Sequence, residues 1–300
     1  MSGIVGIGSA VYDFLIRLDH FPTEDTKQET RETKSQCGGP CAVALIAASR
    51  LGCGASYLGT VGGDRYGAQM LRAFEACGVD VSRVRTAPGS VSFHSFVLLS
   101  GANASRTCLW NRGSVPPPSA DDIDPDVLRQ ADFLHLDGHQ TQAALHAAQL
   151  AHAYGVPVSL DAGGMYPGME ALLPLADVLI PSEEFALQAT GAASAEDAAA
   201  RLYAQYRPQT LVITQGSRGG FLWEDGKPRR YPAFTVTAID SNGAGDTFHG
   251  AFLAARTMGR GDYDAAVFAS AASALKCTRF GAQDGIPNRE EVLAFLKERT

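Results

Sequence analysis

The run GAGD at positions 243–246 places three residues with almost no side chain directly before a carboxylate. An apolar, largely β-branched segment at 234–239 precedes it, and the apolar residues after it recur at helical spacing. The pattern predicts a strand, a tight turn and a helix that begins near Ala244. The first N–H groups of a helix have no partner within the helix, and glycine leaves room beside them. A phosphoryl group could therefore bind at this turn.

Asp246 would lie beside that anion site, where a carboxylate is unfavourable unless it has a task. The natural task is to accept the proton of a hydroxyl that attacks a bound phosphoryl group. The alternative is an ordinary turn from strand to helix, with Asp246 as a helix-start residue. A short run of this kind does not by itself decide between the two.

Other polar residues follow predicted buried strands. Asp13 follows the first of these strands, and Asp137 and His139 follow another at 131–136. A second glycine-rich turn, at 215–220, also comes directly after an apolar run. Ligands of open α/β sheets bind at the carboxyl ends of the strands, so these residues predict a ligand site at one edge of a sheet. For Asp13, a turn or capping role is the alternative.

Predicted strands alternate with helical segments along most of the chain, which is typical of an α/β protein with a doubly wound, mainly parallel sheet flanked by helices. Gly38 and Gly39 precede one such helix near Pro40 and could bring backbone close to a ligand, the alternative being tight helix packing. The segments at about 14–36 and 91–112 have the pattern of exposed antiparallel strands instead. We expect them to pair into a small β-sheet that forms a lid.

The composition, 45% hydrophobic and 19% charged over 300 residues, is typical of a globular protein, and we expect one domain over 1–300. A net charge of −7 without a Lys/Arg cluster argues against nucleic-acid binding. We expect no membrane segment, because no apolar run of about 18 residues and no signal-peptide pattern occurs. The six cysteines form no CxxC pair, which indicates free thiols and a cytoplasmic location. The exposed lid edge favours a homodimer.

Four motifs together resemble the ribokinase-like (PfkB) carbohydrate kinase family over essentially the whole chain. They are the Gly38-Gly39 pair, GTVGGDRY at 59–66, TQGS at 214–217 and the GAGD turn, and they occur in the order found in the family. The resemblance implies a ribokinase-like fold and an ATP-dependent phosphotransferase. It implies an anion hole and a catalytic base with the following residues: Gly243, Ala244 and Gly245 for the hole, and Asp246 for the base.

The resemblance also implies ligand contacts elsewhere in the chain. Sugar hydroxyls would be held by Asp13, Gly38, Gly39 and Asp137. The nucleotide would be lined by Thr214, Gly216, Ser217, Gly219, Ala271, Ala274 and Leu275. Mg²⁺ would bridge the phosphates, with Glu183 or Glu184 in place of the glutamate of the family, and K⁺ is expected near Asp240.

Within the family the sequence is most similar to sulfofructose kinase and then to ketohexokinase, on pieces such as FPTE at 21–24 and ALKCTR at 274–279. This favours a ketohexose or a derivative such as sulfofructose as the acceptor. Lys27 and Asn111 would then contact its anionic group. The arginine expected after the strand at 133–136 has no counterpart, and the candidate replacements are Arg106, Arg112 and His139. The alternative for Lys27 and Arg112 is a solvated lid surface.

Other acceptors are open. Ribokinase has Asn at the positions of Val11 and Val43, where both side chains contact ribose, and two valines cannot make those hydrogen bonds. Ketodeoxygluconate, ribose and a nucleoside are the alternatives, and a nucleoside could stack on aromatic lid residues such as Phe93 and Trp110. A sugar-binding relative without kinase activity is the alternative of a different class, and the intact GAGD turn counts against it.

Overall fold

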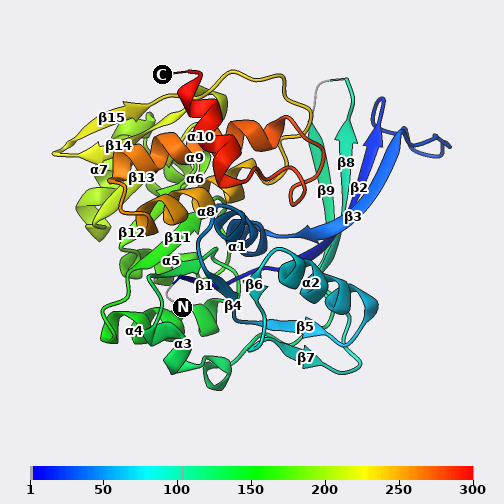
Figure 1. The fold of residues 1–300 in the computed structure, drawn as a ribbon, viewed down its shortest axis with the longest axis horizontal. Helices are drawn as coiled ribbons and strands as arrows, with labels where there is room; N and C mark the ends of the chain where they lie inside the picture. The colour runs from blue at the N-terminus through cyan, green and yellow to red at the C-terminus, as the bar shows by residue number, and fades with distance from the viewer. Residues whose placement is uncertain (1–2, 103–104, 300) are drawn as a thin grey trace.

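The structure, a computed structural model, describes residues 3–102 and 105–299, with a large sheet between two layers of helices and a smaller sheet to one side (Figure 1). The large sheet has the spatial order β15 (Lys227–Tyr231), β14 (Gly220–Glu224), β13 (Thr210–Thr214), β12 (Val178–Pro181), β11 (Val158–Ala162), β10 (Phe133–Leu136), β1 (Ile4–Ile7), β4 (Ala55–Tyr57) and β6 (Val79–Asp80).

Neighbouring strands from β13 to β6 pair in parallel, and β13, β14 and β15 pair antiparallel. The chain winds from β1 outward to β6 and then returns to β10 on the other side of β1. The predicted doubly wound, mainly parallel sheet is therefore confirmed, and its switch point lies between β1 and β10. The sequence did not predict the β14–β15 hairpin, because the glycine-rich segment at which β14 begins has the pattern of a turn.

Two helical layers cover the sheet, and each buries one apolar cluster. One layer consists of α1 (Pro40–Arg50), α2 (Arg65–Ala76), α8 (Ala244–Thr257), α9 (Asp262–Cys277) and α10 (Arg289–Lys297). The other consists of α3 (Pro125–Arg129), α4 (Thr141–Ala153), α5 (Met169–Leu172), α6 (Glu183–Thr190) and α7 (Ala195–Tyr206). Within the described ranges, no helix combines the length and apolar character needed to cross a membrane.

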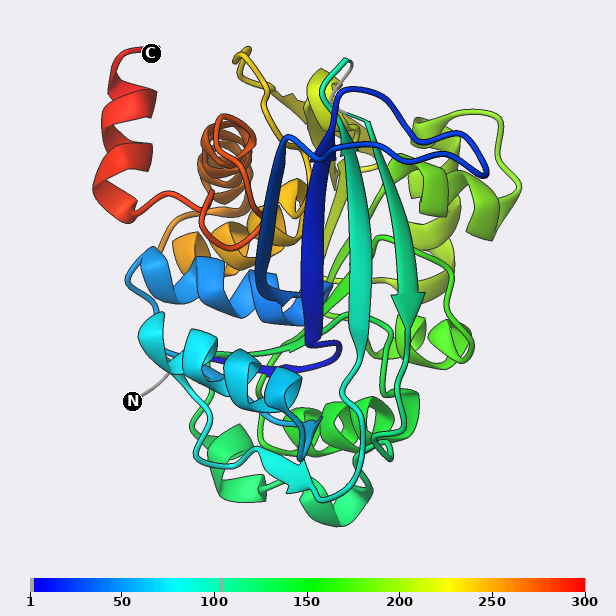
Figure 2. The same cartoon turned by 90° about the vertical axis from the view of Figure 1, so that its right-hand side faces the viewer.

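The small sheet has the order β3 (Glu32–Gly38), β2 (Val11–Leu18), β8 (His94–Ser100) and β9 (Arg106–Asn111) (Figure 2). The two segments expected to leave the main sheet do pair with each other, and they join through a parallel pairing of β2 with β8. β5 (Thr60–Gly62) and β7 (Arg85–Ala87) form a separate two-stranded sheet. The residues between β2 and β3 form an exposed loop rather than strand.

The helix expected at the GAGD turn is α8, which begins at Ala244. Gly243 precedes it with φ 78°, a left-handed conformation that favours glycine. The strand expected at 234–239 is wrong, because this segment lies outside regular structure. The N–H groups of Ile239 and Asp240 donate to the carbonyl of Cys277 at 2.7 and 3.1 Å, so the end of α9 holds the segment in place of a strand ladder.

Gly250 allows α8 to cross α1 at close range. A Cβ atom at this position would lie 2.0 Å from the carbonyl oxygen of Ala44, and that oxygen belongs to the buried part of α1, residues 41–48, which cannot easily shift. We expect Gly250→Ala to lower the free energy of unfolding by about 1–3 kcal/mol, measured by urea denaturation.

Gly245→Ala provides the matched control on the same helix. A Cβ atom there would have no other atom within 4 Å, so its unfolding midpoint should stay within error of the unmodified protein. An unchanged midpoint for Gly250→Ala would show that α1 and α8 can separate at little cost.

Candidate active site

Two cavities, of about 760 and 430 Å³, meet at the N-terminus of α8. Thr214, Ser241, Ala244 and Gly245 line both of them. The larger cavity lies at the carboxyl ends of β1 and β10, where the direction of the sheet winding changes. A group that passes from a ligand in one cavity to a ligand in the other would pass the turn that begins α8.

Backbone N–H groups at this turn are placed to meet an anion. The N–H of Ala244 donates to the carbonyl of Ser241 at 3.2 Å, and that of Thr247 donates to the carbonyl of Gly243 at 2.9 Å. Between them lie Gly245 and Asp246, in the first helical turn, where N–H groups find no partner within a helix. Gly245 has open space where a side chain would begin, which leaves this end of the helix accessible from both cavities.

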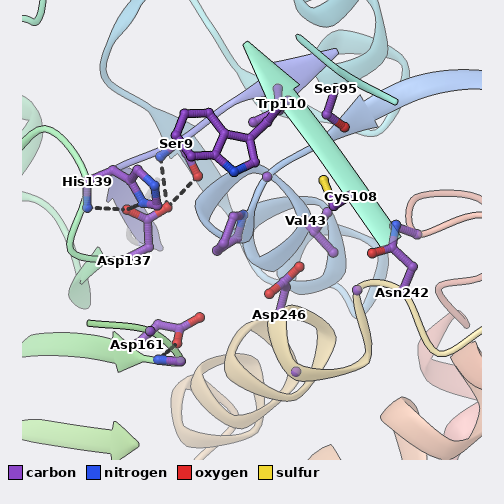
Figure 3. Close-up of a pocket in the computed structure, with 18 of the residues that line it drawn as sticks. Ser9, Val43, Ser95, Cys108, Trp110, Asp137, His139, Asp161, Asn242 and Asp246 are labelled. Carbon is purple, nitrogen blue, oxygen red and sulfur yellow. Dashed lines mark hydrogen bonds and ion pairs between the residues drawn. The ribbon is translucent and has the colours of Figure 1, made fainter. Parts of the chain in front are cut away.

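Asp246 points into the larger cavity from the first turn of α8 (Figure 3). Burial raises its pKa to about 7, and the negative charge of Asp161 adds to this shift. The charges of His249 and Arg106 lower the pKa of Asp246 and so oppose the shift. A carboxyl group with a pKa near neutrality is suited to accept and release a proton under ordinary conditions.

Asp161 and His249 belong to this site although the sequence did not mark them. His249 Nε2 lies 3.1 Å from Asp161 Oδ1, and both side chains are buried at the wall of the larger cavity. His249 lies three residues after Asp246 on the same helix, and Asp161 lies near the end of β11 much as Asp137 follows β10. These two positional signals could have identified them.

Asp137 connects three elements beneath the larger cavity. Its Oδ2 accepts hydrogen bonds from the N–H and hydroxyl of Ser9, both at 2.8 Å, and from the N–H of Cys41 at 3.1 Å. Its Oδ1 accepts from the N–H of His139 at 3.0 Å. Burial alone would raise the pKa of Asp137, but these bonds and the charge of His139 hold it well below its usual range. Asp137 therefore stays ionised and fixes the ends of β1 and β10 to the start of α1.

Asp13 lies on the small sheet and also lines the larger cavity. Burial raises its pKa to about 6, opposed by the hydrogen bond that Oδ1 accepts from the hydroxyl of Ser95 at 2.6 Å. A Cβ atom at Gly38 would lie 1.9 Å from Asp13 Oδ2, so Gly38 makes room for this carboxylate. Gly39, at φ 95°, lines the cavity itself.

Three basic side chains also line the larger cavity: Arg106 belongs to β9, Arg112 follows it directly, and His139 follows β10. Lys27 and Asn111 do not line either cavity. Lys27 lies in the exposed loop between β2 and β3, and the side chain of Asn111 accepts a hydrogen bond from the N–H of Gly113 at 2.8 Å. The structure therefore does not bring these two predicted acceptor contacts to the site.

The smaller cavity contains the four predicted residues of the glycine-rich turn, namely Thr214, Gly216, Ser217 and Gly219. The contribution of α9 differs from the prediction. Ala274 lines the cavity, but Ala271 packs in the core and Leu275 also lies off the lining. The lining residues of α9 are Ser270, Ser273, Ala274 and Cys277, the spacing of one helical face. The family resemblance therefore pointed to the right segment, but not to the residues of that segment that face the cavity.

Neither of the two predicted metal contacts, Glu183 for Mg²⁺ and Asp240 for K⁺, lines a cavity. Both carboxylate oxygens of Glu183 are bound by side chains of the glycine-rich turn, one by Gln215 at 2.8 Å and the other by Arg218. Glu183 thus anchors that turn and lines neither cavity. Asp240 is fully buried beneath the turn that begins α8. Among the described residues, no group of three or more His, Cys, Asp or Glu side chains is placed to hold a metal ion.

Two cavities that meet at a helix N-terminus, with a carboxyl group facing one of them, are the arrangement of an enzyme that transfers an anionic group. Comparison with known proteins agrees: the pfkB family carbohydrate kinase model matches residues 1–289. A ribokinase of Haemophilus influenzae is 31% identical over 306 residues, covering 97% of each chain. An ATP-dependent ribose-1-phosphate kinase of Halopiger xanaduensis is 30% identical over 302 residues, covering 100% of this chain and 99% of its own.

Solved structures agree with the fold. Arabidopsis thaliana ribokinase complexed with ribose and ATP superposes with a TM-score of 0.86 at 27% identity, covering 99% of each chain. Ribokinase from Thermotoga maritima gives a TM-score of 0.85 at 26% identity, covering 99% of this chain and 100% of that one. The protein belongs to the PfkB family of carbohydrate kinases and has the ribokinase-like fold. It is a phosphotransferase with a hydroxyl acceptor. The relatives named here do not support the finer resemblance to sulfofructose kinase.

The raised pKa of Asp246 predicts a pH dependence. A base must be ionised to accept a proton, so we expect kcat/KM to fall roughly tenfold per pH unit below the pKa of about 7 and to level off above it. The measurement is the initial rate of ADP release between pH 5 and 9. Asp246→Asn cannot accept the proton, so its residual rate should not show this acid limb. A flat profile across this range would contradict the prediction.

Proposed function

We propose that this protein transfers the γ-phosphoryl group of ATP to a hydroxyl of a small sugar, with ATP in the smaller cavity, the sugar in the larger one and Asp246 as the base. The observation that carries the proposal is that Ala244 and Gly245 line both cavities while Asp246 faces the larger one. The transferred group would thus meet the free N–H groups of α8 at the junction.

In this reaction the acceptor oxygen forms a bond to the γ-phosphorus as the bond from that phosphorus to the ADP oxygen breaks. The proton of the acceptor hydroxyl passes to Asp246. The N–H groups of Gly245 and Asp246 face the charge on the phosphoryl oxygens. Mg²⁺ binds through one or two carboxylates together with substrate phosphates. Asp161, whose carboxylate lines the cavity beside Asp246, fits that need, and the ion would neutralise phosphate charge when bound.

The acceptor we propose is a ketohexose derivative with an anionic group, such as sulfofructose. Arg106, Arg112 and His139 gather positive charge on the cavity lining, where they could bind a sulfonate, phosphate or carboxylate. Val11 and Val43 also line the cavity, and they offer no hydrogen bonds to a neutral sugar. One relative is, by its name, a kinase of ribose 1-phosphate, which is a sugar with an anionic group.

Ribose is the second candidate, and the observation that favours it is the 31% identity to a ribokinase over nearly the full length. A panel of acceptors separates the two: fructose, sulfofructose, fructose phosphates, ribose, ribose 1-phosphate, ketodeoxygluconate and adenosine, each with ATP–Mg²⁺. ADP release with an anionic sugar, and its loss in Asp246→Asn, supports the proposal. Preference for ribose would make the protein a ribokinase. Sugar binding without turnover on any acceptor would support a non-catalytic relative.

Arg112 allows a direct test of the anionic group. Its guanidinium lies 5.2 Å from the ring centroid of Trp110 at the cavity wall, whereas Arg106 also influences the pKa of Asp246. Loss of a charged hydrogen bond costs about 1.5–3 kcal/mol, so Arg112→Gln should raise KM for an anionic acceptor roughly 10- to 150-fold. KM for a neutral sugar should not change. Arg129→Gln, on the remote surface of α3, is the matched control. Equal effects on both acceptors would contradict the assignment.

We further propose that the protein is a homodimer through the small sheet. Its edge strand β9 is exposed along its whole length, and Phe96 and Leu109 have exposed fractions of 41% and 55%. We expect sedimentation at twice the 31.6 kDa of the chain. Leu109→Asp should shift the protein to a monomer, whereas Val91→Asp, which alters an exposed residue outside the sheet, should not. A monomeric unmodified protein would contradict this proposal.

A further inference from the structure

Lys276 is a fully buried lysine that lies behind the turn at the start of α8. It belongs to the last turn of α9, and its side chain has an exposed fraction of 0%. Its Nζ donates a hydrogen bond to the carbonyl oxygen of Asp240 at 2.8 Å and lies 3.8 Å from Asp240 Oδ2. Burying an ammonium group is costly unless it is paired. The position of Lys276 therefore requires an explanation, and the chemistry described above does not use it.

The partner of this lysine holds the turn that precedes α8. Asp240 Oδ1 accepts a hydrogen bond from the N–H of Asn242 at 2.8 Å, and Oδ2 accepts from the N–H of Gly281 at 2.9 Å. The chain then continues through Gly243 directly into the free N–H groups at the start of α8. Lys276, through Asp240, can therefore influence the position of those N–H groups without contacting a ligand.

The surroundings of Lys276 are shaped to accommodate its side chain. Gly285 lies beside it, and a Cβ atom there would be 3.2 Å from Lys276 Cε and 2.7 Å from the carbonyl oxygen of Gly281. Burial lowers the pKa of Lys276, and the negative charge of Asp240 opposes that effect. The carbonyl oxygen and the carboxylate beside this buried positive charge are also the type of oxygen ligand that binds a metal cation.

The K⁺ expected near Asp240 does not fit this arrangement. The carbonyl oxygen of Asp240 already accepts from the ammonium group, and each of its carboxylate oxygens already accepts from a backbone N–H. A second cation at Asp240 would lie within a few ångströms of the first, in a buried environment where like charges repel strongly. The oxygens of Asp240 that would bind K⁺ are thus already occupied, the carbonyl oxygen by Lys276 and the carboxylate oxygens by backbone N–H groups.

We propose that Lys276 is a built-in replacement for a monovalent cation: its ammonium group holds Asp240 and the 241–243 turn in the geometry needed for phosphoryl transfer. Lys276 is a positioning residue, since it acts through Asp240 and contacts no substrate. The proposal rests on the proposed kinase function. It implies that the reaction needs no added K⁺, and that removing the ammonium group creates a dependence on one.

Two variants separate this role from simple packing. Lys276→Met keeps an unbranched side chain of similar length and removes the charge, and Lys227→Met, on the exposed β15, is the matched control. The first readout does not depend on the acceptor. We expect the melting temperature and the affinity for ATP of the unmodified protein to be the same in KCl and in choline chloride. In Lys276→Met we expect both to be lower in choline and to rise with K⁺ or NH₄⁺.

The second readout is turnover with the acceptor found in the panel. We expect the unmodified enzyme and Lys227→Met to be insensitive to K⁺. Lys276→Met should lose at least about tenfold in kcat without K⁺ and recover part of it with K⁺ or NH₄⁺, with KM for the sugar little changed. Activation of the unmodified enzyme by K⁺, or a kcat of Lys276→Met equal to that of the unmodified enzyme in choline, would overturn the proposal.

The two readouts distinguish which idea has failed. If no acceptor is phosphorylated while the stability and ATP-binding results appear as expected, the proposed function fails, and what stands is that Lys276 holds the 241–243 turn in place of a cation. If Lys276→Met does not fold, the K⁺ insensitivity of the unmodified protein and the behaviour of Lys276→Arg, which keeps the charge, still decide the question. Lys276→Arg that folds and remains insensitive to K⁺ supports the proposal, and K⁺ dependence in either protein overturns it.

Discussion

The site depends on one constraint: the first turn of α8 must be held rigidly where the two cavities meet, with its N–H groups free. Close packing secures the body of the helix, because Gly250 lets α8 approach the backbone of α1 at Ala44. Hydrogen bonds secure its start, because Asp240 binds the N–H groups of Asn242 and Gly281. The amides at the turn are thus pre-positioned, and they need not reorganise when an anion binds.

The larger cavity shows how one cluster can give similar groups different roles. Asp137 and Asp246 are both carboxylates, and both lose solvent on folding. Asp137 accepts four hydrogen bonds from Ser9, Cys41 and His139, so it stays ionised and serves as a fixed anchor. For Asp246, burial raises the pKa towards neutrality, and the negatively charged neighbour Asp161 adds to this shift. In many enzymes, different surroundings give two carboxyl groups different pKa values, so that one stays ionised and the other can transfer a proton.

The small sheet contributes the part of the site that sets specificity. Its strands bring Val11, Asp13 and Arg106 to one wall of the larger cavity, opposite residues from the main sheet such as Asp137. The phosphate half of the site therefore belongs to α8, α9 and the glycine-rich turn, and much of the acceptor half belongs to a separate sheet. Relatives that share the first half can differ in the second, which is why family membership fixes the reaction class and leaves the acceptor to be measured.

The sequence by itself determined the alternation of strands and helices, the turn and helix at 243–257, and most of the residues that line the two cavities. These follow from local rules: glycine at a left-handed turn, helical spacing after it, and polar residues at the ends of buried strands. Only the tertiary structure decided the rotation of α9, which turns Ser273 to the cavity and Ala271 to the core. It alone also decided that Lys276 is buried against Asp240. It also decided that Lys27 lies away from the cavity while Arg106 and Arg112 line it. The physical reason is that the direction of a side chain depends on what its element packs against, and that contact joins residues far apart in the chain.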